Sequence, residues 1–97
     1  MKKSNIMDGS IDFIESRLTE AIDVGELAQQ AFFSKTHYQR LFRAIVGELV
    51  MEYVKNRRLQ LACRDVLAGN TKILDIALKY GYDSHEGFTR AFSSLLY

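Results

Sequence analysis

The sequence contains one cysteine, two histidines and no proline in 97 residues. Cys63 has no second cysteine with which to form an internal disulfide, and we expect it to be a small buried residue of a helix. His37 and His85 lie far apart in the sequence, so neither a metal site nor another cofactor is predicted. No carboxylate pair, Cys–His pair or glycine-rich phosphate loop occurs at a useful spacing, which argues against catalytic residues and an enzyme.

Long apolar runs are absent as well. No run approaches ~18 residues, and the first residues lack the pattern of a secretion signal, so neither a membrane span nor export is predicted. The hydrophobic share of 47% and the charged share of 26% are ordinary for a soluble globular protein. We therefore expect a cytoplasmic protein with a modest core, in one small domain or two minimal lobes.

The positive charge is concentrated in the middle of the chain. The whole chain carries +1, but residues 32–64 carry +5, whereas residues 1–31 carry −3 and residues 65–97 carry −1. Because clustered lysines and arginines bind phosphate groups, this distribution favours a nucleic-acid partner more than the net charge does.

One stretch without glycine or proline organises the rest of the chain. It lies between Gly47 and Gly69 and is rich in Leu, Val, Met, Ala, Arg and Lys, so we predict one long connecting helix over residues 48–69. About 21 residues at ~1.5 Å each span roughly 31 Å, which is close to the ~34 Å of one turn of duplex DNA.

The segments on either side of this helix look like two copies of one unit. Matching residues stand 49 or 50 positions apart, in the pairs Leu27/Ile76, Ala28/Ala77, Ser34/Ser84, Tyr38/Phe88, Arg40/Arg90 and Phe42/Phe92. Each copy predicts a short helix, a tight turn and a second helix that begins at a serine. The sequence therefore predicts an all-α fold with two helix-turn-helix lobes, over residues 11–47 and 70–97, joined by the linker helix and preceded by a flexible lead-in over residues 1–10.

Capping residues and apolar spacing define the helices of the first lobe. A support helix is predicted from Ile11, Ile14, Leu18 and Ile22. Asp23 with Glu26 predicts a capping box for the next helix, and Ser34 caps the one after it. In that third helix the inward face is predicted to contain Tyr38, Leu41, Phe42 and Ile45.

The second lobe shows the same signals. Thr71 is predicted to cap its first helix, Gly81 to end that helix in a left-handed conformation, and Ser84, after Asp83, to cap its second helix. The inward side chains of this last helix are predicted to be Phe88, Phe92 and Leu95.

The outward faces carry side chains that can read DNA. In the first lobe these are Lys35, Thr36, Gln39, Arg40 and Arg43. Arg40 can pair with guanine O6 and N7, and Gln39 with adenine N6 and N7, so these two are the main candidate base readers. The helix N-terminus at Ser34 and Lys35 suits a phosphate oxygen. On the face alone, a merely solvated surface is an equally good interpretation.

The outward face of the second lobe is more ambiguous. It consists of His85, Glu86, Thr89 and Arg90. Glu86 can accept a hydrogen bond from cytosine N4, or it can simply repel phosphate.

Three segments together resemble the DNA-binding domain of the AraC/XylS family of bacterial transcription regulators: LAQQAFFSKTHYQRLFRAIVG, YVKNRRLQLA and ILDIALKYGYDSHEGFTRAF. The likeness covers about Ile11 to Phe92. It implies that two recognition helices enter successive major grooves of double-stranded DNA to control transcription. The residues predicted to contact DNA are Ser34, Lys35, Thr36, His37, Gln39, Arg40, Arg43, Ser84, His85, Glu86, Thr89 and Arg90.

The chain departs from the family pattern at three places. Leu49 and Val50 stand where the family often has Ser-Pro, and Ser93 stands where a basic residue is usual. The family usually continues beyond Tyr97 with a further short helix, which this sequence lacks. Either that final helix has been cut off, or something else covers the face of Phe88 and Leu95. RNA polymerase and a separate effector-binding or dimerisation domain outside this chain are further partners that the resemblance implies. The alternative is a helical protein–protein interaction module without specific DNA binding.

Overall fold

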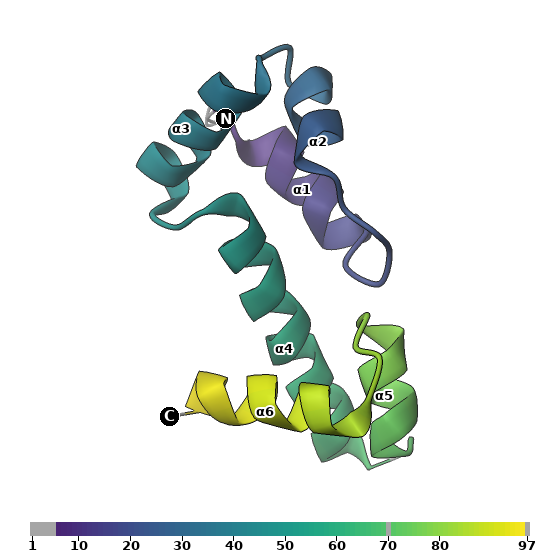
Figure 1. Cartoon of the computed structure of the whole chain (residues 1–97). Coiled ribbons are helices and arrows are strands. Elements are labelled where there is room, and N and C mark those ends of the chain that lie inside the picture. Colours follow the sequence, from purple (N-terminus) through teal and green to yellow (C-terminus); the bar gives the residue numbers. More distant parts are fainter. Residues whose placement is uncertain (1–5, 70, 97) are drawn as a thin grey trace. The chain divides into compact units, whose positions relative to one another are not determined.

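The computed structural model describes residues 6–69 and 71–96 of the chain, apart from the side chains of residues 95 and 96. The described residues form six α-helices, which confirms the all-α class (Figure 1). The helices are α1 (Asp8–Ser16), α2 (Val24–Gln30), α3 (Lys35–Val46), α4 (Val50–Ala68), α5 (Ile73–Lys79) and α6 (His85–Leu96). The chain divides into two compact units, Met1–Val54 and Lys55–Tyr97, and α4 crosses the boundary between them.

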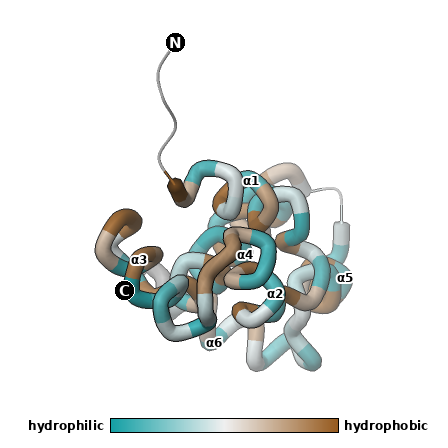
Figure 2. Tube along the Cα trace, turned by 90° about the horizontal axis from the view of Figure 1, so that it is seen from above, coloured by the Kyte–Doolittle hydropathy of each residue, from teal (hydrophilic) through white to brown (hydrophobic). Residues whose placement is uncertain are grey.

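Hydrophobic and hydrophilic residues are mixed along the coils of the helices in Figure 2, as expected for helices that bury one face. The predicted connecting helix is present as α4. It is slightly shorter than expected, since it starts at Val50 and ends before Gly69, whose φ of 73° is accessible to glycine at little cost. No helix in the described part of the chain is long and apolar enough to cross a membrane.

The first unit begins earlier than the sequence indicated. Helix α1 starts at Asp8, Met7 is fully buried, and the hydroxyl groups of Ser10 and Tyr38 share a hydrogen bond of 2.6 Å. The lead-in expected over residues 1–10 is therefore wrong for residues 7–10, because burial of Met7 stabilises an additional helical turn. Residues 1–5 lie outside the described part.

The core of the first unit fixes α3 on one side. Its buried side chains are Met7, Ile14, Leu18, Val24, Leu27, Ala28, Tyr38, Phe42, Val50 and Val54. The ring of Phe42 meets that of Tyr53 with centroids 5.7 Å apart, and the Tyr53 hydroxyl donates a hydrogen bond of 2.8 Å to Glu15 Oε2. Each large buried apolar side chain stabilises the fold by about 1.5–3 kcal/mol, so α3 is held against α1 and the start of α4 by its Tyr38 and Phe42 face.

One apolar residue of α3 lies outside this core. Ile45 was predicted to face inward but is 41% exposed, whereas Val46 is half-buried. The buried side chains Tyr38 and Phe42 belong to the earlier turns of α3, so the contact face at the last turn is completed by Val46 rather than by Ile45.

The second unit has a core of its own. Its buried members are Leu59, Ala62, Ile76, Ala77, Tyr80 and Phe88, with Leu61, Val66, Tyr82, Ala91 and Phe92 packed around them. Phe88 is 2% exposed and its ring stacks on Phe92 with centroids 5.7 Å apart, so Phe88 is covered without any further helix. The side chain of Leu95 lies outside the described part. Cys63 is half-buried rather than buried, because Leu59 and Ala62 occupy the inner face of α4.

A polar cluster ties α4 to the end of α5. Asp65 Oδ2 accepts hydrogen bonds from Lys79 Nζ at 3.1 Å and from the Tyr80 hydroxyl at 2.9 Å. Partial burial raises the pKa of the Asp65 carboxyl, but the two hydrogen bonds outweigh it and lower that pKa overall. The hydrogen bond to Asp65 also raises the pKa of Lys79. The cluster therefore favours the charged forms of both residues in the folded state.

The start of α5 differs from the prediction. The N-cap is Lys72, with φ −66° and ψ 146°, and it makes no side-chain capping bond, so the prediction of Thr71 as the cap is wrong. The extended backbone falls at Lys72, one residue after the side chain that could have capped the helix, and burial of Ile76 and Ala77 holds α5 instead.

Candidate nucleic-acid interface

The turn between α2 and α3 is a hydrogen-bonded helix cap. After the C-cap Ala31, the N–H of Phe32 donates to the carbonyl oxygen of Gln29 at 3.1 Å and the N–H of Phe33 donates to that of Ala28 at 2.9 Å. This pair of bonds is the Schellman arrangement, in which the residue after the C-cap takes a left-handed backbone conformation. Phe32 does so, with φ of 65°.

The turn between α5 and α6 repeats the same bonds in the second unit. After the C-cap Tyr80, the N–H of Gly81 donates to the carbonyl oxygen of Leu78 at 3.1 Å and the N–H of Tyr82 donates to that of Ala77 at 2.9 Å. Gly81 has φ of 90°, as predicted. The two turns are thus one motif used twice, which agrees with the sequence repeat.

Both second helices begin at the predicted serines. Ser34 Oγ accepts a hydrogen bond of 3.1 Å from the N–H of His37, and Ser84 Oγ accepts one of 3.0 Å from the N–H of Gly87. The caps leave the earlier N–H groups of each helix without an intrahelical partner, so each N-terminus keeps donors and a partial positive charge for an anion. Asp23 likewise caps α2, accepting from the N–H of Glu26 at 3.1 Å.

The residues of the first lobe that were predicted to contact DNA lie at the surface, on α3 or at its N-cap. All of the following are exposed: Ser34, Lys35, Thr36, His37, Gln39, Arg40 and Arg43. The same helix turns Tyr38 and Phe42 inward, and that packing fixes which face is presented. Among the residues that the structure describes, no carboxylate pairs with Lys35, Arg40 or Arg43. These three cations are therefore available for phosphates or base edges.

Two residues of this face, His37 and Gln39, lie beside apolar neighbours. The ring of His37 lies against Phe33, with centroids 5.0 Å apart, so its side chain is tied to the turn. Gln39 borders a hollow of about 320 Å³ that Leu49, Val50 and Met51 also line. Gln39 therefore presents its amide beside an apolar rim at the junction of α3 and α4.

The outer face of α6 is exposed but less basic. His85, Glu86, Thr89 and Arg90 all lie at the surface, whereas Ser84 is half-buried beneath its cap bond. A carboxylate accompanies the single arginine here, while three cations occur on α3. The electrostatic attraction for a phosphate backbone is thus stronger at α3.

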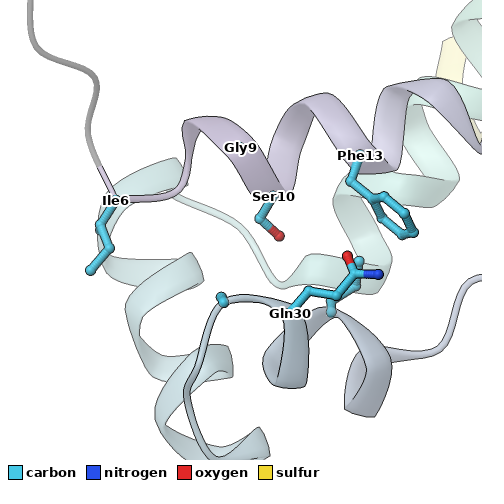
Figure 3. Close-up of a pocket in the computed structure, with 7 residues that line it drawn as sticks. Ile6, Gly9, Ser10, Phe13 and Gln30 are labelled. Carbon is cyan, nitrogen blue, oxygen red and sulfur yellow. The ribbon is translucent and has the colours of Figure 1, made fainter.

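A separate hollow of about 370 Å³ lies on the first unit between α1 and α2. Figure 3 shows Ser10, Phe13 and Gln30 around it, with Ile6 and Gly9 at the start of α1. None of the twelve predicted DNA-contacting residues lines this hollow. The Ser10 hydroxyl in this hollow is already bonded to Tyr38.

Two helix-turn-helix units, each with a capped and exposed second helix, define a class of DNA-binding protein, and comparison with known proteins agrees. A model of the family described as "Helix-turn-helix domain" matches residues 27–96. The chain is 36% identical to the HTH-type transcriptional activator AarP of Providencia stuartii, over 97% of this chain and 70% of AarP. It is 34% identical to the right origin-binding protein of Escherichia coli (strain K12), over 95% of this chain and 32% of that protein.

The solved structures show the same fold. An AraC-type transcriptional regulator from Chromobacterium violaceum superposes with a TM-score of 0.86 at 20% identity, over 94% of this chain and 81% of that one. The chain belongs to the AraC-type helix-turn-helix family and is a DNA-binding domain of a transcription regulator.

Proposed function

We propose that the chain recognises a specific duplex sequence with α3 as its principal reading helix and α6 as a second one, and that it acts in the bacterial cytoplasm. The observation that carries this proposal is the exposed face of α3, where Lys35, Arg40 and Arg43 stand without an acidic partner among the described residues. Such a face is the footprint expected of a helix that lies in the major groove. No catalytic step is part of the proposal.

The side chains of α3 have distinct roles in this proposal. Arg40 pairs with a guanine, Gln39 pairs with an adenine, and the Thr36 methyl group contacts a thymine. Ser34, Lys35 and the free N–H groups at the start of α3 hold a phosphate, and Arg43 holds another. The buried neighbours Tyr38 and Phe42 reduce the freedom of this face before binding.

The second lobe has the same arrangement, but its recognition helix carries a weaker positive charge. Glu86 accepts from a cytosine amino group and Arg90 pairs with a guanine, while Ser84, His85 and Thr89 lie at the groove edge. Helix α4 contains 19 residues, a length of roughly 28 Å at ~1.5 Å per residue, which supports occupation of successive major grooves.

The proposal is tested by selecting bound sites from random duplexes and footprinting the enriched ones. We expect two protected major-groove segments centred about 10 base pairs apart on one face of the DNA. We also expect the logarithm of the binding constant to fall linearly with the logarithm of salt concentration. A single protected segment would contradict the role of α6, and failure to enrich any sequence would contradict the whole proposal.

A protein-binding module is a second candidate, and one observation favours it. Four large apolar side chains are exposed in the second unit: Leu67, Ile73, Leu74 and Leu78. Exposed apolar side chains suit contact with a protein, whether RNA polymerase or a separate effector-binding or dimerisation domain. Binding to a protein through these side chains would show little salt dependence, whereas binding to DNA through α3 would be strongly salt-dependent.

A further inference from the structure

Phe32 combines two unfavourable properties. Its φ of 65° makes it the one residue other than glycine with positive φ in the described ranges, and its side chain is 93% exposed. A left-handed backbone brings Cβ close to the following carbonyl oxygen, which is why bulky residues rarely adopt it. An exposed phenyl ring also gains nothing from burial.

The fold itself does not require a phenylalanine at this position. The second helix-turn-helix places Gly81 at the equivalent position, with the same two turn bonds and a φ of 90°. Glycine adopts this conformation without a steric penalty. In the first turn the bonds of Phe32 and Phe33 to the end of α2 hold the strained backbone in place. Strained backbone that the surrounding structure holds in place is often found at functional sites.

The position of Phe32 indicates what its ring meets. It lies two residues before the N-cap Ser34, at the end of α3 that leads into the groove in helix-turn-helix proteins. The ring has no group that can bind a phosphate. Within the major groove, the apolar feature that a phenyl ring can contact is the C5 methyl group of thymine.

We propose that Phe32 is a specificity-determining residue that contacts a thymine methyl group beside the first recognition helix. The inference rests on the proposed DNA-binding function and extends it to a residue of the turn. The hydrogen-bonded turn fixes the backbone of Phe32 before DNA arrives, so only the side-chain torsions lose freedom on binding.

The test compares Phe32→Gly with the unaltered chain on a duplex obtained by selection. The melting temperature should rise by about 4–8 °C because glycine relieves the strain. The affinity for the duplex should fall by about fourfold, the effect expected for one lost methyl-sized contact. The salt dependence should stay the same because no phosphate contact is removed.

Replacing single thymines by uracil then locates the contact. At one position the loss of the methyl group should weaken binding of the unaltered chain about fourfold and leave binding of Phe32→Gly unchanged. Ile6→Ala is the matched control, because Ile6 is an apolar residue of the first unit that is 54% exposed and is not among the predicted DNA-contacting residues, so its loss is expected to leave the affinity unchanged.

Two results would overturn the inference. One is unchanged affinity of Phe32→Gly, and the other is a uracil effect of equal size in both proteins at every position. In either case selection and footprinting with the unaltered chain would still succeed, so the proposed function would stand. If the unaltered chain selects no duplex, the proposed function fails and this inference fails with it.

Discussion

Replacing Phe88 by alanine should unfold the second unit while the first unit stays folded. Phe88 is 2% exposed, and its ring lies 5.6 Å from that of Tyr82 and 5.7 Å from that of Phe92. Removing a buried phenyl ring destabilises a core by about 3–5 kcal/mol. At roughly 0.05–0.15 kcal/mol per residue, a unit of about 40 residues has a stability of only about 2–6 kcal/mol. The loss is therefore comparable with the whole stability of that unit.

Hydrogen exchange read by mass spectrometry separates the two units. Amides of α5 and α6 should lose their protection in Phe88→Ala, while those of α1, α2 and α3 keep theirs. Ser94→Ala is the control, because Ser94 is exposed on the same helix and its hydroxyl can be removed without opening a cavity. Equal loss of protection in both units would refute the reasoning that each lobe is held by its own core.

Two further substitutions test α4 and its polar cluster. Ala62→Gly should lower the free energy of unfolding by about 1–2 kcal/mol, because Ala62 is fully buried in the middle of α4. Ala68→Gly, at the exposed end of the same helix, should have a much smaller effect. Thermal melting of the two variants measures the difference. Because the pKa of Asp65 is lowered, its carboxylate stabilises the fold at pH values above the unfolded pKa of ~3.9. Because the pKa of Lys79 is raised, its ammonium group stabilises the fold at pH values below the unfolded pKa of ~10.4. When the pH is lowered from 7 to 3, the melting temperature of Asp65→Asn should therefore fall by less than that of the unaltered chain. An equal fall in both proteins would contradict the stabilising role of this cluster.

Much of this structure could be predicted from local interactions between residues that are close in the sequence. Ser34 and Ser84 cap their helices as predicted, because a serine side chain reaches the N–H three residues later whatever surrounds it. Gly81 ends α5 in a left-handed conformation for a similarly local reason. The exposed polar face of α3 could be predicted from helical periodicity, since burial of Tyr38 and Phe42 leaves the polar residues outside.

Features that depend on packing between helices could not be predicted from the sequence in this way. Met7 belongs to the core although it lies in a mostly polar segment, and Ile45 lies at the surface although it continues an apolar stripe. Both depend on where neighbouring helices end. Phe32 was overlooked because the left-handed turn position carries no glycine there. Comparison with Gly81, 49 positions further on, was the one signal that could have found it.

Helix α3 should carry most of the affinity for DNA. Arg40→Ala should weaken binding by about 1–3 kcal/mol and relax the preference at one base pair, as expected for a lost bidentate guanine contact. Arg90→Ala should weaken it less, because α6 presents its single arginine beside Glu86. Arg17→Ala is the control, since Arg17 lies over the Phe13 ring and beside Glu20, away from α3's outer face.

The decisive measurement is the titration of these three variants against the selected duplex at two salt concentrations, with circular dichroism to show that each remains folded. We expect a large loss of affinity for Arg40→Ala, a smaller one for Arg90→Ala and none for Arg17→Ala. A loss for Arg90→Ala equal to or greater than that for Arg40→Ala would contradict this expectation, and would make α6 the principal reading helix.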